Sequence, residues 1–436
     1  MYRKSKDMNI LLIQPWHSKD RSYRSRLSCL VSYAPLTLAT LAALIPKDIV
    51  CNLDVCDEIL TKMNYEKKQY DIVAITAQTS VALRAYELAE FFKKRGAYVV
   101  LGGYHPTYMP QEAARYADTV IVGAAEYAWP QFLRDYQAGT PQKIYNMQNV
   151  KGEDIVDADR SVIPKRKYLK YPAIVANRGC PNTCEFCVIS QMWRECTPRP
   201  VKDVIHEIKN LHAKMITFFD PNIFALRDYA IELMTELAKL NIMWAGSATI
   251  NAAYDTELME LARKSGCAGL LVGLESLNPD TLKRSKKGFN DPNKYKEAIS
   301  IMQSYGLSVN GCFVLGMDGD TEELLLSLPE QVQFLNLNLA RFSILTPVPN
   351  SPLYKRLQTE GRLLTKDWSQ YNQHQAVFTP THMTPERLEE IYRYVWKETY
   401  SFKNLFARFR RLPNKTLKEK LVCIGANLGF KYLGIY

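Results

Sequence analysis

The sequence lacks the marks of a membrane-spanning or secreted protein. None of its apolar runs approaches the roughly 18 uninterrupted residues that a transmembrane helix needs. The N-terminal residues 1–7 carry no secretory cleavage pattern and lead into a short apolar run typical of a strand. Apolar content is ordinary for a globular chain, and 436 residues are enough for two domains and an appendage. These absences predict a cytoplasmic protein.

Histidine is also scarce, with 6 in the chain, whereas there are 10 cysteines. Most of the cysteines are expected to be reduced thiols, because a long chain without a signal sequence rarely depends on disulfides. Only Cys180, Cys184 and Cys187 are clustered, in the spacing C-x3-C-x2-C directly after an apolar run. Thiolates this close can converge from a single loop, and such soft ligands suit zinc or an iron-sulfur cluster.

A closed zinc site would need a fourth ligand, and the sequence offers none in a recognisable place. His206 and His212 do not stand at a zinc-pair offset, and Cys196 breaks the repeat expected of a zinc ribbon. Three ligands to a four-iron cluster leave one iron open to bind and reduce a small molecule. The thiols therefore predict a catalytic [4Fe-4S] cluster; a structural metal knuckle or coincidentally buried thiols are the alternatives.

Acidic residues are almost absent near the C-terminus, where residues 402–420 hold only Glu419. The same stretch holds much of the basic excess behind the net charge of +11, at Lys403, Arg408, Arg410, Arg411, Lys415, Lys418 and Lys420. Apolar side chains interleave with these at helical spacing, at Phe402, Leu405, Phe406 and Phe409. This amphipathic pattern predicts either a solvated helix packed on the main body or peripheral contact with a membrane surface.

The first third of the chain alternates short apolar runs with helical stretches. Strands are predicted at residues 9–14, 71–76, 97–101 and 119–122, and the stretch 82–95 has the apolar stripe of a helix. This alternation predicts an α/β fold with a Rossmann-like, doubly wound parallel sheet in domain 1–140. Ligands of such sheets bind beyond the carboxyl ends of the strands. The polar and glycine residues at those ends are Thr76, Gln78, Thr79, Gly102, Gly103, His105, Pro106, Thr107 and Glu126.

Six further strand-helix units follow a polar stretch, 141–170, that is predicted to be an interdomain linker. Their strands are predicted at residues 173–176, 215–219, 242–245, 270–272, 309–314 and 341–345. Repeated parallel units indicate a partial (β/α)6 barrel over 171–375, with chemistry at the carboxyl ends of its strands. The cysteine loop follows the first of these strands. Residues 376–436 are predicted to form a small, helical and basic C-terminal region.

These patterns carry a resemblance to a known family. C-x3-C-x2-C with an aromatic residue, Phe186, before its last cysteine is similar to the motif of the radical S-adenosylmethionine (SAM) enzymes. The loops after the second, third and fourth strands, at residues 76–79, 102–107 and 123–126, together with residues 34–39, resemble the cobalamin-binding domain fused to one branch of that family. Residues 350–354 and 368–378 resemble the segment that follows the barrel in its methylases and ring-forming enzymes. The resemblance covers residues 8 to about 400.

The resemblance implies three cofactors: a [4Fe-4S] cluster on Cys180, Cys184 and Cys187, SAM, and cobalamin. SAM would be bound by Phe186 at the adenine, Asp220 at the methionyl amine, Ser247 and Thr249 at the ribose, and Glu275. Glu275 comes one place early for the family's G-x-I-x-G-x-x-E pattern, and its alternative is a carboxylate paired with Lys or Arg. Cobalamin would be bound by Thr76, Gln78, Thr79, Gly102, Gly103, His105, Pro106, Thr107 and Glu126.

One departure concerns the lower face of the cobalt. Many cobalamin domains place a ligating histidine in D-x-H-x-x-G after the first strand, whereas residues 15–20 here contain His17 without that Asp or Gly. A histidine without an orienting carboxylate lacks the support that such ligands use. We therefore expect cobalamin to bind without a protein histidine on cobalt.

The family resemblance implies a cobalamin-dependent radical SAM C-methyltransferase. A deoxyadenosyl radical would remove hydrogen from an unactivated carbon, methylcobalamin would deliver the methyl group, and an external electron donor would reduce the cluster. The family branch and the basic amphipathic tail suggest a lipophilic small-molecule substrate. One alternative uses the same cofactors for ring formation, oxidation or rearrangement without methyl transfer. Another is a cobalamin or redox sensor whose tail binds nucleic acid, and the complete cysteine triad disfavours it.

Overall fold

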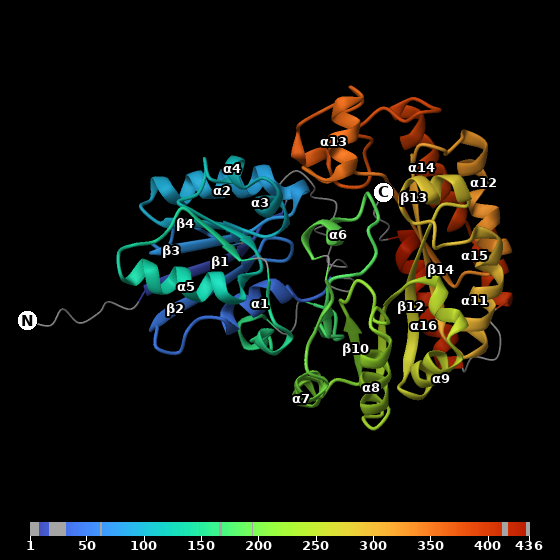
Figure 1. The fold of residues 1–436 in the computed structure, drawn as a ribbon, viewed down its shortest axis with the longest axis horizontal. Helices are drawn as coiled ribbons and strands as arrows, with labels where there is room; N and C mark the ends of the chain where they lie inside the picture. Colours follow the sequence, from blue (N-terminus) through green and yellow to red (C-terminus); the bar gives the residue numbers. More distant parts are fainter. Residues whose placement is uncertain are drawn as a thin grey trace, which may run out of the picture. The chain divides into compact units, whose positions relative to one another are not determined.

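Two parallel sheets of six strands each organise the chain (Figure 1). The structure is a computed structural model, and it describes residues 8–16, 32–61, 63–147, 149–164, 168–193, 195–411 and 417–432, without the side chains of 417–419, 421 and 422. Contacts divide the chain into two units, Met1–Lys170 and Tyr171–Tyr436, which are described separately. Each sheet belongs to one unit.

The first unit is built on a sheet in the order β2-β1-β3-β4-β5-β6, with all pairs parallel. Its strands are β1 (Met8–Gln14), β2 (Cys51–Asp57), β3 (Ile72–Thr76), β4 (Tyr98–Gly102), β5 (Thr119–Gly123) and β6 (Ile144–Met147). Its helices are α1 (Leu36–Ala43), α2 (Ala82–Lys94), α3 (Tyr104–Tyr108), α4 (Pro110–Ala113) and α5 (Ala125–Gln137), with 3-10 turns η3 (Thr79–Val81), η4 (Gly152–Asp154) and η5 (Arg160–Val162).

Helices cover both faces of this first sheet. Ile10 and Leu12 of β1 belong to a core that also holds Leu38 of α1 and Trp129 of α5. Successive strand residues point to opposite faces, so the equally buried Leu11 lies on the other face. That face is covered by α2, which lies opposite α5 in Figure 1. The doubly wound α/β fold expected from the sequence is therefore confirmed.

The segment 141–170, expected to be a linker, is instead part of the first unit. It contributes β6, which pairs with β5 at the edge of the sheet. Tyr145, Ile163 and Tyr168 are buried in the same core as α5, and Ile155 is buried nearby. The segment was predicted to be a linker because its composition is polar. Only a few of its apolar residues, spaced well apart, pack in the core.

The second unit contains an open barrel whose strands follow one another in the order β14-β13-β12-β11-β10-β7, all parallel. These strands are β7 (Ala173–Ile174), β10 (Met215–Phe218), β11 (Met243–Ala248), β12 (Cys267–Glu275), β13 (Ser308–Leu315) and β14 (Leu339–Ile344). All six strands expected from the sequence are present. A short antiparallel hairpin of β8 (Asn177–Arg178) and β9 (Thr197–Pro198) follows the first of them.

Helices on the outer surface of this sheet complete a single large core. They are α7 (Val201–Leu211), α8 (Arg227–Leu237), α9 (Thr256–Lys264), α10 (Pro279–Arg284), α11 (Tyr295–Ser304) and α12 (Glu322–Phe334). Two further helices, α6 (Val188–Met192) and α13 (Pro352–Thr359), follow β8 and β14 and do not belong to this core. Short 3-10 turns lie at η6 (Ile250–Tyr254), η7 (Pro292–Lys294) and η8 (Trp368–Gln370). Asn278 caps α10 as its Asn-Pro start indicates, because its side chain accepts the backbone N–H of Asp280 and Thr281.

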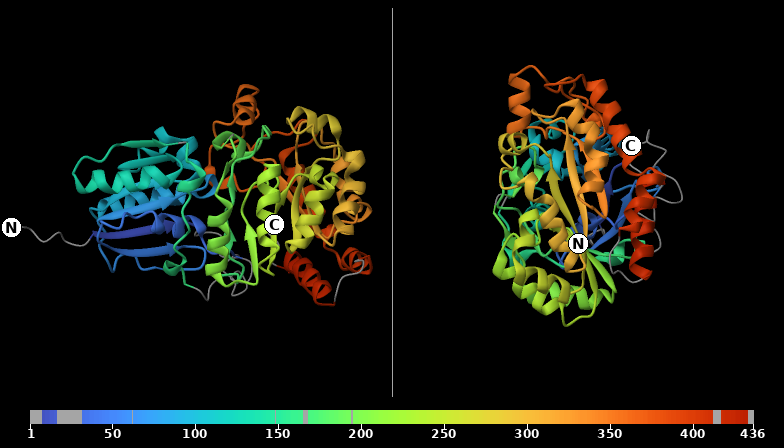
Figure 2. Two further views of the ribbon diagram at one scale, coloured as in Figure 1. Left: turned by 60° about the horizontal axis from the view of Figure 1, so that its bottom comes forward. Right: turned by 90° about the vertical axis from the view of Figure 1, so that its right-hand side faces the viewer.

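Three C-terminal helices, α14 (Pro385–Thr399), α15 (Phe402–Arg410) and α16 (Leu417–Tyr432), pack on this unit and appear in red tones in Figure 2. Leu388, Ile391 and Val395 of α14 form the expected apolar stripe and belong to the barrel core. The helical C-terminus expected from the sequence is confirmed. Across the described residues, no helix is both long and apolar enough to cross a membrane.

Candidate active site

The loop with the three clustered cysteines is held at its two ends by the β8–β9 hairpin. Asn177 pairs with Pro198 and Arg178 with Thr197, so residues 179–196 form a closed excursion at the carboxyl end of β7. Gly179 opens the loop with a φ of 89°, and a Cβ there would lie 2.0 Å from the carbonyl oxygen of Glu195. Only glycine fits this approach of the two arms of the loop.

Inside the loop, Ser190 holds the last two cysteines through their backbone. Its buried hydroxyl lies 2.9 Å from the carbonyl oxygens of both Cys184 and Cys187. The N–H of Cys187 also donates to the carbonyl of Cys184 over 3.2 Å, and the N–H of Glu185 donates to the carbonyl of Ser285 over 3.0 Å. The loop is thus fixed by its own hydrogen bonds and by the turn after α10.

The donor chemistry of Cys180, Cys184 and Cys187 fits a four-iron cluster. All three are free thiols on one short loop. Burial raises the pKa of Cys184 to about 11, and the positive charge of Lys287 opposes that rise in pKa. In the described part of the chain, no three Cys, His, Asp or Glu side chains converge as they would on one metal ion. A four-iron cluster instead takes one thiolate on each of several irons, which lie apart.

A buried ion pair lies beside these thiols. Lys287 Nζ lies 2.6 Å from Glu275 Oε1, and each side chain is 10% exposed. Burial lowers the pKa of Lys287, but Glu275, followed by Cys184 and Cys187, raises it, and the net shift of the pKa is upward. A Cβ on Gly273 would lie 2.3 Å from the Glu275 carboxylate and 2.7 Å from the Lys287 ammonium. Glycine at this position therefore leaves room for the pair.

Glu275 itself ends β12 in a left-handed conformation, with a φ of 67°. This backbone conformation is costly for a residue with a side chain and persists only where the surroundings impose it. The ladder between β12 and β13 shifts register at the same point, between Gly273 and Glu275. The carboxylate is thus aimed by an irregular strand end, and Lys287 holds it in place. The alternative role considered for Glu275, a carboxylate paired with a lysine, matches the observed contact.

Asp220 follows β10 and holds the segment that leads into the cysteine loop. Its two carboxylate oxygens accept the backbone N–H groups of Ala176, at 2.9 Å, and Asn177, at 2.8 Å. The side chain is 1% exposed, and burial raises its pKa to about 7 against the opposing effect of these hydrogen bonds and Arg199. A direct contact between Asp220 and the methionyl amine was expected from the sequence. In the structure both oxygens of this carboxylate are instead bonded to the backbone, so the carboxylate supports the loop.

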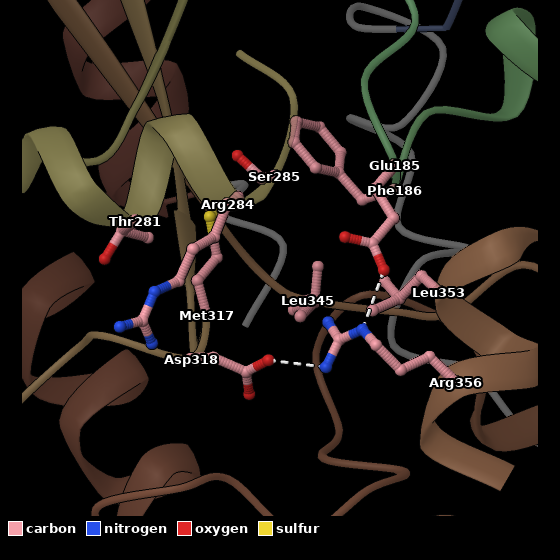
Figure 3. Close-up of a pocket in the computed structure, with 10 residues that line it drawn as sticks. All are labelled: Glu185, Phe186, Thr281, Arg284, Ser285, Met317, Asp318, Leu345, Leu353 and Arg356. Atoms are coloured by element: carbon pink, nitrogen blue, oxygen red, sulfur yellow. Dashed lines mark hydrogen bonds and ion pairs between the residues drawn. The ribbon is translucent and has the colours of Figure 1, made fainter. Parts of the chain in front are cut away.

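A small pocket lies beside the cysteine loop, and the side chain of Phe186 forms part of its lining (Figure 3). Three side chains complete its apolar wall: Met317 after β13, Leu345 after β14 and Leu353 in α13. Thr281, Arg284, Ser285, Glu185, Asp318 and Arg356 supply its polar atoms. Apolar walls with a few polar groups are typical of small-molecule sites. Ser247 and Thr249 are half-buried at the end of β11 and do not line this cavity.

An ion-pair network joins the cysteine loop to α13. Arg356 of α13 donates to Glu185 over 2.9 Å and to Asp318 over 2.7 Å, as the dashed lines of Figure 3 show. Arg362 donates to the other oxygen of Asp318 over 2.7 Å. Burial acts to raise the pKa of Asp318, but the hydrogen bonds from Arg362, Arg356 and Thr381 bring its pKa below the usual value. These ion pairs therefore hold α13, which forms one side of the cavity, against the cysteine loop.

The first unit gathers most of the expected cobalamin residues along one sheet edge. The loops after β3, β4 and β5 are tied together there: the N–H of Ala77 donates to Gly102 O, and the N–H of Gly123 donates to the hydroxyl of Thr107. Gln78 is exposed, and Thr76, Thr79, Gly102, Gly103 and Thr107 are half-buried. These six residues share an open edge at the carboxyl ends of parallel strands, where such sheets bind ligands.

His105, Pro106 and Glu126 were also expected to contact cobalamin, but their side chains are buried. The ring of His105 is fully buried, and its Nε2 lies 3.0 Å from the hydroxyl of Tyr86 and 3.3 Å from Glu112 Oε1. Its partners fix α3 against α2 and α4, so the histidine supports the loop from inside. His17, the other histidine considered from the sequence, lies outside the described residues.

Comparisons with known proteins agree with this arrangement. Residues 33–133 match the B12 binding domain family, residues 174–328 match the radical SAM superfamily, and residues 351–422 match a domain of unknown function, DUF4070. Bacteriochlorophyllide d C-8(2)-methyltransferase of Chlorobaculum tepidum is 30% identical over 395 residues, 85% of this chain and 85% of the relative. The C-12(1)-methyltransferase of the same organism is 29% identical over 357 residues, 79% of this chain and 78% of the relative.

Among solved structures, the fold resembles the radical SAM methyltransferase TsrM from Kitasatospora setae, solved with cobalamin and a [4Fe-4S] cluster. The TM-score is 0.71 at 15% identity, over 90% of this chain and 89% of TsrM. The chain therefore belongs to the cobalamin-dependent radical SAM enzymes, in the branch of the B12-dependent methyltransferases. The cofactors of this family are a [4Fe-4S] cluster, SAM and cobalamin.

Several residues of this site were not identified from the sequence. Arg356 lies 171 residues along the chain from Glu185, and Lys287 lies 12 residues from Glu275. No local pattern joins either pair. Ser190 follows the cysteine motif in a short helix, where serine has no distinctive signal. The proximity of strand ends in a parallel barrel could have suggested that basic residues near the mouth pair with Glu275, but not which ones.

Replacing Arg356 with glutamine is expected to weaken SAM binding about tenfold, because Glu185 would lose its partner and release the adjacent Phe186. The free energy of unfolding should fall by about 1 kcal/mol or less, since the arginine is 37% exposed. Equilibrium dialysis of the cluster-loaded protein with radiolabelled SAM measures the first effect, and urea unfolding the second.

Arg387→Gln is the matched control. Arg387 is 41% exposed and also pairs with two acids, Glu322 and Glu390, but these lie on α12 and α14. It should leave the affinity for SAM unchanged. Equal losses of affinity in the two variants would show that the Arg356 network has no special link to the cofactor site.

Proposed function

We propose that this protein is a C-methyltransferase that transfers a methyl group to an unactivated carbon of a lipophilic small molecule. One observation carries the proposal: three free thiols stand on one braced loop at the carboxyl end of a six-stranded open barrel, in a chain that also carries a B12-binding domain. When bound, the cluster and SAM supply a radical that removes hydrogen, and cobalamin supplies the methyl group.

Cys180, Cys184 and Cys187 would hold the cluster, leaving one iron open for SAM. Their loop has little freedom, because the β8–β9 hairpin, Ser190 and Asp220 hold it. Lys287 places a positive charge close to Cys184 and Cys187, and Glu275 partly neutralises it. These residues would orient the cluster and limit the access of water to it.

SAM would lie with its adenine against the ring of Phe186. The aromatic ring and the side chains of Met317 and Leu345 offer apolar surface to a flat heterocycle. Ser247 and Thr249 would contact the ribose from the end of β11, and Glu275 would face the methionyl part from the end of β12. Asp220 would act through the loop that it supports, not by direct contact.

Cobalamin would bind at the open edge of the first sheet, against Thr76, Gln78, Thr79, Gly102, Gly103 and Thr107. The half-buried glycines let a large ring approach the backbone. His105, Pro106 and Glu126 would support these loops from beneath. The domains would divide the work, with 1–140 binding cobalamin, 171–375 binding cluster and SAM, and 376–436 covering the barrel.

The substrate is proposed to be a lipophilic small molecule because the two relatives compared above are named as methyltransferases of bacteriochlorophyllide d, a tetrapyrrole pigment. An external electron donor would supply the electron that SAM cleavage requires. The chain's own contribution is to bind, orient and shield the reacting groups.

The experiment is an anaerobic assay of the reconstituted full-length protein with SAM deuterated in its methyl group, dithionite and bacteriochlorophyllide d. Methyl transfer predicts deuterated methyl in the pigment together with deoxyadenosine, both measured by mass spectrometry. Deoxyadenosine together with a changed but unmethylated pigment would overturn methyl transfer in favour of ring formation or oxidation. Deoxyadenosine with the pigment unchanged would overturn a substrate of the bacteriochlorophyllide class.

A further inference from the structure

Helix α15 presents aromatic and basic side chains together on one outward face. Phe402 is 67% exposed and Phe406 is 64% exposed, far more than expected for large apolar side chains in a folded domain. At 3.6 residues per turn, Phe402, Lys403, Phe406 and Arg410 fall on one side of the helix. All four are exposed. Leu405 and Arg408, on the opposite side, are buried.

The buried side fixes α15 firmly to the second unit. Leu405 belongs to the barrel core. Arg408 is 3% exposed and donates to the side chain of Asn427 in α16 and to the carbonyl of Thr399. Asn427 in turn donates to the carbonyl of Asn338 over 3.2 Å. The exposed phenylalanines therefore stand on a rigid support.

The end of α16 extends this outward face. Lys431 Nζ lies 4.1 Å from the centre of the Phe402 ring, and the neighbouring Tyr432 is 66% exposed. Arg410 lies 5.7 Å from the centre of the Phe406 ring. Residues 402–411 contain no Asp or Glu. The surface formed by Phe402, Lys403, Phe406, Arg410, Lys431 and Tyr432, called here the C-terminal patch, is both aromatic and positively charged.

We propose that the C-terminal patch docks on the surface of an anionic lipid bilayer. Aromatic rings mixed with Lys and Arg suit the boundary between headgroups and acyl chains, where the rings enter the apolar layer and the cations stay with the phosphates. The charge sets the kind of bilayer: a neutral bilayer would leave these cations uncompensated. The inference concerns a surface distinct from the cofactor sites and does not depend on the proposed function.

The test is co-sedimentation of the full-length protein with vesicles of equimolar phosphatidylcholine and phosphatidylserine, compared with pure phosphatidylcholine. Binding is expected only to the anionic vesicles, and added salt should weaken it. The double variant Phe402→Ser/Phe406→Ser should bind at least about tenfold more weakly, because two rings no longer enter the bilayer. Lys403→Glu/Arg410→Glu should lose binding at low salt as well.

Val50→Ser is the matched control, since Val50 is 63% exposed in the first unit and should not affect sedimentation. Thermal unfolding of each variant verifies that the fold is kept, which the surface position of every substituted residue favours. The proposal is overturned if the parent protein does not sediment with anionic vesicles, or if the aromatic and charge variants sediment as the parent does. Salt-sensitive binding to duplex DNA, equal to or tighter than binding to the vesicles, would assign the patch to nucleic acid instead.

Discussion

Replacing Cys187 with alanine should abolish SAM cleavage while cobalamin binding remains. The cluster would lose one of its three protein ligands. The B12-binding match lies in the first unit, at residues 33–133, so corrin binding should persist. Deoxyadenosine release measures the first effect, and the corrin absorption of the anaerobically purified protein measures the second. Cys180→Ala and Cys184→Ala should behave in the same way.

Cys196→Ala is the control for this result. Cys196 lies in the same closed excursion as the triad and is half-buried like Cys187, but it falls outside the C-x3-C-x2-C spacing. It should retain cluster absorption and deoxyadenosine release close to those of the parent. Equal loss of the cluster in Cys196→Ala would point to a four-thiolate site without an open iron. Joint loss of cluster and corrin in Cys187→Ala would mean that the two units do not bind their cofactors independently.

Replacing Lys287 with methionine should lower the free energy of unfolding by about 3–5 kcal/mol, because the Glu275 carboxylate would stay buried without a partner. The two side chains are 10% exposed and 2.6 Å apart, so water cannot compensate. Chemical unfolding of the cluster-free protein under reducing conditions measures the loss without interference from cluster assembly. The same variant should also lower the SAM cleavage rate of the loaded enzyme, since a positive charge beside two thiols is removed.

Two further variants locate the cause. Lys287→Met combined with Glu275→Gln removes both charges and should recover much of the lost stability. Lys264→Met breaks a pair with Glu260 whose side chains are 66% and 53% exposed, and should cost less than about 0.5 kcal/mol. A single Lys287 variant as stable as the parent would show that the pair is not what holds Glu275 in its left-handed conformation.

Strong local signals in the sequence were sufficient for most of the fold. The buried strands β1, β3, β4 and β5 are short apolar runs, and a parallel sheet covered on both faces requires such runs. The edge strands β2 and β6 were missed because an edge strand is less buried and mixes polar with apolar residues. The same weakness led to the prediction of a linker at 141–170.

Site residues could be predicted where a sequence motif identifies them. The role of a site residue was uncertain where it depends on tertiary contacts. The cysteine spacing is written in ten consecutive residues, and Phe186 comes with it. The contacts of the Asp220 and His105 side chains could not be predicted from a sequence motif. Both stand after strands, where ligand contacts are expected, yet both turn inward to bonds with backbone or buried side chains. The direction of a side chain depends on neighbours that lie far away in the sequence.

By itself, the sequence determined the two α/β domains, the thiol triad and the cofactor family, because each rests on spacing or periodicity within a short stretch. Only the tertiary structure decided that Lys287 neutralises Glu275, that Arg356 ties the cysteine loop to α13, and that the phenylalanines of α15 face outward. The physical reason is the same in each case. Charge pairing and exposure are set by distances in space between residues that the chain separates, and only the folded chain fixes those distances.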